Sequence, residues 1–170
     1  MKEIREFKTH KEMKETHQKD VNEFPFIFVF AFSDKEFIEK MTEEIQKRKP
    51  KCTGITTMEG IAKHVRSIGA GGYVLHEDYP TMIEMFDRHD KEKKLLSKNN
   101  KKLKEMILFE MNNHEYGYTR DPYDTLMALG KTYEDLKNDV QFSSAWSKAQ
   151  KKCFADFDKA NAEEECELER

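Results

Sequence analysis

The stretch FPFIFVFAF, from Phe24 to Phe32, constrains the fold of this chain more than any other part of the sequence. Phenylalanine occupies every second position, and Ile27, Val29 and Ala31 lie between the last four of these rings. Alternation of period two with aromatic and β-branched residues predicts a β-strand, because successive side chains of a strand point to opposite faces of the sheet. Since both faces are apolar, we expect this strand to be central and buried on both sides.

A β-hairpin is predicted from two further short alternating segments. Residues 64–68 and 73–75 have the pattern of strands, and the glycine-rich residues 69–72 between them tolerate positive φ angles. The same glycines could cradle a phosphate group, but that use requires a helix to begin directly after them, and a strand is expected there. A hairpin is therefore the preferred interpretation.

Helical patterns account for most of the remaining chain. Apolar residues recur at three- and four-residue spacings, and Ser33 with Glu36 has the spacing of a capping box. The predicted helices cover about residues 9–22, 34–48, 100–113 and 141–163, and shorter helices begin near Asp121 and Thr132. We therefore expect one α+β domain over residues 1–170: a small, mostly antiparallel sheet covered by helices, with a long C-terminal helix.

The composition excludes several classes of protein. The 30 Lys and Arg side chains nearly balance the 33 Asp and Glu side chains, giving a net charge of −3, whereas a strongly basic nucleic-acid binder or an acidic DNA mimic would be unbalanced. No apolar run approaches the roughly 20 residues of a membrane helix, and the N-terminus has no apolar signal segment, so we expect a cytoplasmic protein. The three cysteines are widely separated, which argues against a disulfide framework and a four-cysteine zinc site.

The stretch FEMNNHEYGYTRDPYD, from Phe109 to Asp124, concentrates the functional groups of the chain. Glu110 and His114 are four residues apart and share one helix face, and Glu115 follows at the helix end. An imidazole with several carboxylates is a workable ligand set for zinc or another divalent metal. The predicted metal ligands are His114, Glu110, Glu115, Asp121 and His89.

Two other interpretations of this stretch stay open. His114 beside a carboxylate could act as an acid–base pair near neutral pH. Alternatively, the polar groups are structural, with His114 at a helix C-terminus and Asp121 capping the next helix, and residues 116–119 forming an edge strand between them. No complete Walker, Rossmann, HExxH, zinc-finger or catalytic-triad pattern favours a particular enzyme.

A lysine-rich segment runs from Lys91 to Lys104. Such a run could contact a nucleic-acid backbone, but it has no interleaved aromatic residues and contains acidic residues, so a solvated helix face with a turn near residues 99–100 is preferred. Nucleic acid is therefore not the expected direct partner. The candidate contacts to a protein partner are Lys94, Lys98, Lys101 and Lys102.

Several segments resemble a domain-of-unknown-function family found in phages and mobile elements of gut Firmicutes and Bacteroidetes. They are FIFVFAFSDKEF, SIGAGGYVL, MFDRHDKE, FEMNNHEYGYT and DPYDTLMALG, and the resemblance covers about residues 24–136. Its most specific element is the motif Asn113-His114-Glu115-Tyr116. No activity carries over from this family.

The setting of the resembling family implies a host-interaction or anti-defence protein, a class that includes small anti-CRISPR inhibitors, some of which bind zinc. We therefore expect a non-enzymatic inhibitor that acts in the host cytoplasm and binds a host defence protein, such as a CRISPR effector nuclease. The alternative is a metal-dependent hydrolase or nuclease that uses the cluster in residues 110–124.

Overall fold

The computed structural model describes residues 3–168, and the side chains of residues 3–163. These residues form two compact units, the first built on residues 16–90 and the second on residues 4–15 and 91–168. The first unit contains β1 (Ile27–Phe28), α2 (Asp34–Arg48), α3 (Met58–Ala62), β2 (Val65–Gly69) and β3 (Gly72–Leu75). The second contains α5 (Asn100–Asn113), α6 (Tyr116–Thr119), α7 (Tyr123–Leu129), α8 (Tyr133–Asn138) and α9 (Val140–Leu168). The division falls inside α1 (His10–Glu23) and α4 (Tyr79–Ser97).

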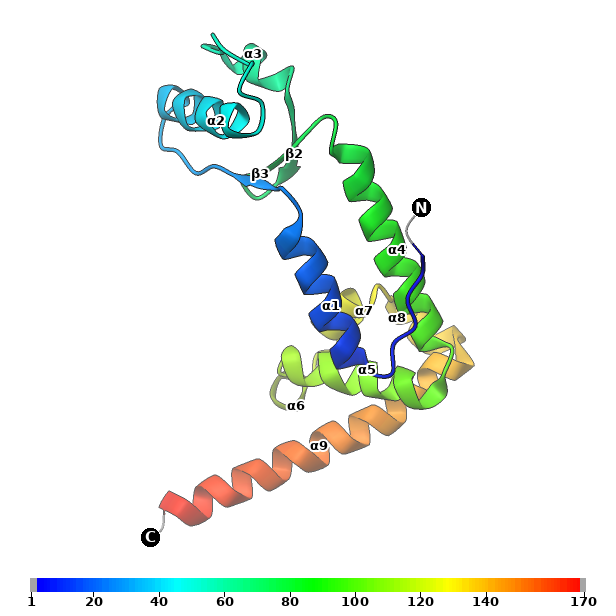
Figure 1. The fold of residues 1–170 in the computed structure, drawn as a ribbon. Coiled ribbons are helices and arrows are strands. Elements are labelled where there is room, and N and C mark those ends of the chain that lie inside the picture. The colour runs from blue at the N-terminus through cyan, green and yellow to red at the C-terminus, as the bar shows by residue number, and fades with distance from the viewer. Residues whose placement is uncertain (1–2, 169–170) are drawn as a thin grey trace. The chain divides into compact units, whose positions relative to one another are not determined.

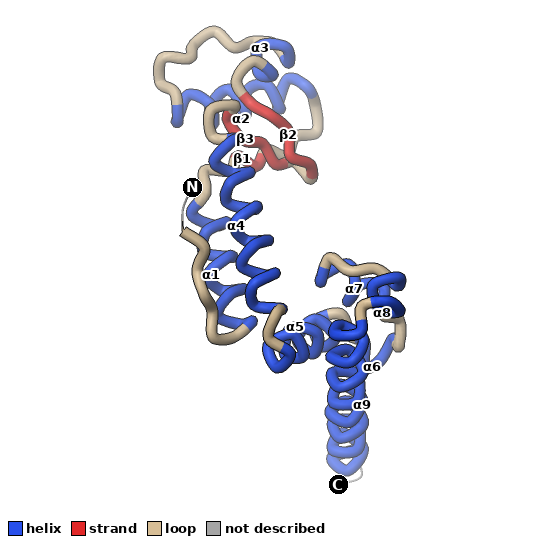
Figure 2. The backbone as a smooth tube through the Cα atoms, turned by 90° about the vertical axis from the view of Figure 1, so that its right-hand side faces the viewer, coloured by secondary structure: helices blue, strands red, loops and turns tan. Residues whose placement is uncertain are grey.

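The first unit is an antiparallel three-stranded sheet with the strand order β1-β3-β2 (Figure 2). Ile27 is opposite Tyr73 in the β1–β3 pair, and β2 and β3 form the predicted hairpin, which is confirmed. Helix α2 covers one face of the sheet (Figure 1). The core between them consists of Ile27, Val29, Met41, Ile45, Ile61, Val65 and Leu75.

The prediction of a central strand over residues 24–32 is wrong. Only Ile27–Phe28 pairs as a strand, and it lies at an edge of the sheet, while β3 is central. Helix α2 buries Ile27 and Val29, but Phe28, Phe30 and Phe32 are 61%, 70% and 103% exposed on the other side of the chain. The sequence alternation correctly separated the two sets of side chains, but only one set has a layer of structure over it.

Side chains of α2 donate hydrogen bonds to backbone carbonyls on the outer edge of this segment. The ammonium group of Lys40 donates to the carbonyl of Phe30 at 3.0 Å, and the guanidinium of Arg48 donates to the carbonyl of Phe26 at 3.2 Å. Ser33 caps α2 as predicted, but the carboxylate of Glu36 accepts from the backbone of Phe32. Because these groups are occupied, the edge is a poor template for an added strand.

The second unit is helical, and its main contact joins α5 to α9. The predicted helices over residues 100–113 and 141–163 are confirmed as α5 and as part of α9. The short helix predicted to begin near Thr132 is confirmed as α8, and Thr132 and Asp135 form a reciprocal capping box at its start. The core of this unit includes Met106, Ile107, Met111, Leu126, Phe142, Trp146 and Ala149. Together the two units give the predicted α+β class with a long C-terminal helix, and folding as one domain stays a prediction.

Residues 116–119 form the one-turn helix α6, so the prediction of an edge strand there is wrong. Glu115 and Arg120 on either side have positive φ angles of 52° and 58°, which reverse the chain direction sharply. Tyr116 is buried against Trp146, and its hydroxyl accepts a 2.6 Å hydrogen bond from Gln150. Packing on α9 therefore outweighs the strand preference of this tyrosine-rich segment.

Replacing Met41 by Ala should lower the unfolding free energy of the first unit by about 2–4 kcal/mol, because the side chain is fully buried between α2 and the sheet. Amide hydrogen exchange in residues 65–75 measures this loss. Met58→Ala is the matched control, since Met58 lies in the same unit and is 48% exposed. Equal losses from both substitutions would contradict the assignment of this core.

Candidate functional site: a buried carboxylate and a neighbouring cleft

Glu110 is the most deeply buried of the predicted site residues, with 3% of its surface exposed. Three basic side chains surround its carboxylate. The Nζ atom of Lys14 lies 3.3 Å from Oε1, Nε2 of His10 lies 3.8 Å from the same oxygen, and Nε2 of His114 lies 3.7 Å from Oε2. We call Glu110, His10, Lys14 and His114 the Glu110 cluster.

Helical spacing on two elements assembles the Glu110 cluster. His10 and Lys14 are one turn apart on α1, and Glu110 and His114 are one turn apart on α5. The Phe109 ring packs against two members of the cluster. The His10 ring contacts it edge-on, with the ring centroids 5.0 Å apart, and the Lys14 ammonium lies 5.6 Å from its centroid. The Glu110 cluster therefore links the start of α1 to α5 through polar contacts within the second unit.

The electrostatics of the Glu110 cluster follow from burial. Within the described residues, Oε2 of Glu110 accepts no hydrogen bond, so the carboxylate depends on the Lys14 ammonium beside Oε1 for compensation. Burial of an isolated carboxylate costs several kcal/mol, which an ion pair of good geometry offsets. The Lys14 ammonium supplies this pair from a partly exposed position.

Two residues of this cluster were missed by sequence reasoning. The sequence predicted a helix over about residues 9–22 but no role for His10, which is 4% exposed and lies within the cluster. The four-residue spacing of His10 and Lys14 was the available signal. This spacing could not show which acidic residue, far along the same chain, the two side chains would contact.

The structure brings together only two of the five predicted metal ligands, Glu110 and His114. Glu115 lines a separate cleft, and Asp121 accepts a hydrogen bond from the backbone N–H of Tyr123 at 2.9 Å. The N-cap of α7 is Pro122, so the prediction of Asp121 as the cap is wrong by one residue. His89 belongs to the first unit, where it bonds Asp20 at 2.8 Å and stacks on His17. Among the described side chains, no group of three or more His, Cys, Asp or Glu is arranged to hold a metal ion. Binding of zinc or another divalent metal stays a prediction.

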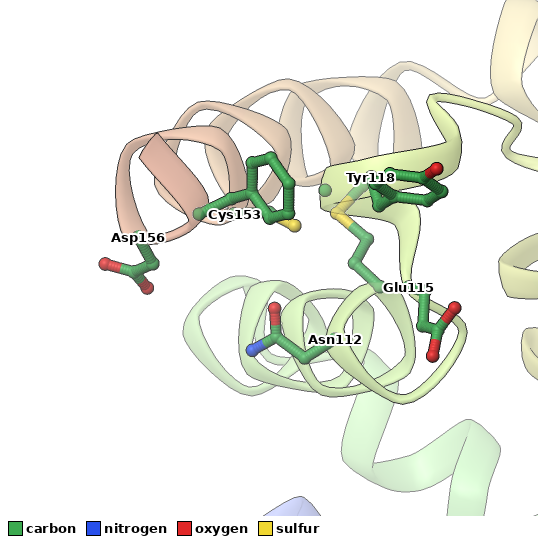
Figure 3. A pocket seen from close by; sticks show the side chains of 8 residues that line it. Asn112, Glu115, Tyr118, Cys153 and Asp156 are labelled. Atoms are coloured by element: carbon green, nitrogen blue, oxygen red, sulfur yellow. The ribbon is translucent and has the colours of Figure 1, made fainter. Parts of the chain in front are cut away.

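An open cleft of about 580 Å³ lies between α5, α6 and α9 (Figure 3). Asn112 on α5 and Asp156 on α9 lie on opposite walls, and the Cys153 sulfur lies deep between them. Cys153 is a free and buried cysteine, and burial raises the pKa of its thiol above the ordinary value. The lining residues are Met111, Asn112, Glu115, Gly117, Tyr118, Cys153, Asp156 and Phe157.

Three of the four candidate partner-binding lysines are exposed, namely Lys94, Lys98 and Lys101. Lys102 is half-buried, and its ammonium group donates to the backbone carbonyl of Phe7 at 2.7 Å. Lys102 therefore hydrogen-bonds the segment around Phe7 to α5 and is not available as a free surface charge. The predicted turn near residues 99–100 is confirmed, because Asn99 caps α5.

Comparison with known proteins finds a match to a protein family. The model of a family of unknown function matches residues 9–152, which is most of the chain. No curated protein and no solved structure matches it. None of the described helices has the length and apolar composition needed to span a lipid bilayer.

Replacing Glu110 by Gln should lower the unfolding free energy of the second unit by about 1–2 kcal/mol, because the buried charge that attracts Lys14 is lost while Lys14 stays half-exposed. Urea denaturation followed by the fluorescence of Trp146, the one tryptophan of the chain, measures the change. Glu105→Gln on the exposed side of α5 is the control. An unchanged midpoint for Glu110→Gln would show that the cluster is not stabilising.

Cys153 should react with iodoacetamide at pH 8 at least about tenfold more slowly than Cys52, because its raised pKa leaves little thiolate and its sulfur is buried. Peptide mapping of the folded protein after timed alkylation measures both rates. In urea the two rates should converge. Rapid labelling of Cys153 in the folded protein would contradict the packing of α6 on α9.

Proposed function

The chain belongs to the family of unknown function DUF7659, and we propose that it is a non-enzymatic anti-defence inhibitor of phage type that binds and blocks a host nuclease complex. The observation that carries this proposal is an exposed aromatic surface in the first unit. We call it the aromatic patch, and its members are Phe28, Phe30, Phe32 and Ile68.

The hairpin glycines hold part of the aromatic patch in place. A Cβ atom at Gly71 would lie 2.8 Å from the Phe30 ring, and one at Gly72 would lie 3.2 Å from the Phe28 ring and 3.0 Å from Ile68. The side chains therefore lie directly on glycine backbone. Rings that are already ordered lose less conformational entropy on binding than mobile side chains do.

The area of the aromatic patch suits a protein interface. An aromatic side chain presents roughly 150–250 Å², so the exposed parts of the three phenylalanines amount to roughly 350–580 Å². A standard interface buries about 800 Å² on each partner, of which somewhat more than half is apolar. The patch therefore matches the apolar centre of one such interface, and a folded protein with recesses for phenylalanine rings is the partner that fits it.

The mode of binding follows from the edge of β1. Lys40 and Arg48 already occupy the outer carbonyls, so the side chains, and not an added strand, make the contact. With a net charge of −3, the protein would block its target sterically. The exposed lysines Lys94, Lys98 and Lys101 belong to the second unit and are candidate contacts separate from the aromatic patch. The phage setting of the resembling family supports a defence nuclease as the target.

The alternative is a metal-dependent hydrolase or nuclease that uses the cluster in residues 110–124, of which Glu110 and His114 lie next to each other. In the described residues the Lys14 ammonium already gives Glu110 a cation at 3.3 Å. The inhibitor is therefore the preferred proposal, and zinc or another divalent metal would have a structural role in it.

A plasmid-interference assay in cells with a type II CRISPR system tests the proposal. Expression of the chain should raise transformation by a targeted plasmid at least tenfold, and the double substitution of Phe30 and Phe32 by Ser should abolish this effect, because the apolar centre of the interface is lost. Val140→Ser, which alters an exposed apolar residue of the second unit, should leave it unchanged.

Two outcomes would contradict this proposal. Unchanged interference in the presence of the wild-type chain would remove the defence nuclease as a partner. Sedimentation that shows a wild-type dimer and a monomeric Phe30→Ser/Phe32→Ser variant would assign the aromatic patch to contact between copies of the chain.

A further inference from the structure

The cleft between α5, α6 and α9 is not used by the proposed inhibitor function and has the features of a binding site of its own. Its deep side is apolar, formed by Met111, Cys153 and Phe157, of which the first two are buried. Tyr118 at its mouth is 76% exposed. A volume of about 580 Å³ lies within the range of ligand sites, which are apolar with a few placed polar groups.

The polar groups at the mouth of this cleft are carboxylates and an amide. Glu115 and Asn112 come from the end of α5, and Asp156 comes from α9 on the other wall (Figure 3). Asp156 is paired with Lys152 at 2.6 Å, whereas no ion pair of the Glu115 carboxylate is found within the described residues. Glu115 is therefore the charge that a ligand would meet.

The nearby cation Arg120 is already engaged. Its guanidinium lies 3.6 Å from the centroid of the Phe154 ring and 3.9 Å from a carboxylate oxygen of Asp158. It also lies 5.7 Å from the centroid of the Phe157 ring, so that phenylalanine already takes part in one cation–π contact. The exposed ring of Tyr118 can make the same kind of cation–π contact with a cationic ligand.

We propose that this cleft binds an arginine or lysine side chain presented by a partner protein. The apolar stem of such a side chain packs on Met111 and Phe157, and its charged head meets the Glu115 carboxylate and the Tyr118 ring. The volume accommodates the side chain together with part of its flanking backbone. Because the cleft lies wholly in the second unit, this inference is independent of the aromatic patch and of the anti-defence function.

Titration of the ¹⁵N-labelled full chain with three probes tests the proposal. The tripeptide acetyl-Gly-Arg-Gly-amide should shift the amide signals of Asn112, Gly117 and Tyr118 saturably. Acetyl-Gly-norleucine-Gly-amide, which keeps the apolar stem and lacks the charge, should bind at least fivefold more weakly. Agmatine, a free cation with the same head, should also bind more weakly, because it lacks the flanking backbone.

Variants of the cleft give the second arm of this test. Glu115→Gln and Tyr118→Ala should each weaken the arginine tripeptide at least fivefold, whereas Glu105→Gln on α5 should leave its affinity unchanged. Trp146 fluorescence checks that each variant is folded. Equal binding of the norleucine tripeptide, full affinity in a folded Glu115→Gln variant, or absence of shifts with any probe would overturn the proposal, and tighter binding of agmatine would reassign the cleft to a small free cation.

Discussion

The apolar contact between α5 and α9 is the interaction on which the second unit depends. Met106, Ile107 and Met111 of α5 share one core with Phe142, Trp146 and Ala149 of α9. This contact fixes the rotation of α5 about its axis, and the rotation in turn decides where its polar residues lie. Glu110 is thereby buried beside His10 and Lys14, while Asn112 and the following turn form a wall of the cleft.

Each unit presents a surface of a different kind. The first offers phenylalanine rings laid over hairpin glycines, which suits recognition by shape and apolar contact. The second offers a recess with an apolar floor and an acidic mouth, which suits a single charged side chain.

The sequence predicted local structure well and tertiary environment poorly. Alternation at residues 24–32 separated Ile27 and Val29 from the phenylalanines, and polar residues at helix starts located α2 after Ser33 and α8 after Thr132. Periodicity cannot tell whether a second layer covers the other face of a strand, so the edge position was missed. The pairing of His10 and Lys14 with Glu110 was also out of reach, because almost a hundred residues separate them and no local pattern encodes such a contact.

The occupied edge of β1 also has a consequence for how this chain avoids self-assembly into fibrils. The segment FIFVFAF, residues 26–32, has high β-propensity, no charge and no proline, the features of a segment that stacks into cross-β structure when its backbone is open. The ammonium of Lys40 and the guanidinium of Arg48 act as gatekeepers by occupying carbonyls that a second chain would need. Protection begins only when α2 docks, so the nascent polypeptide is most vulnerable in the interval before residues 34–75, which supply α2 and the other two strands, have left the ribosome and folded.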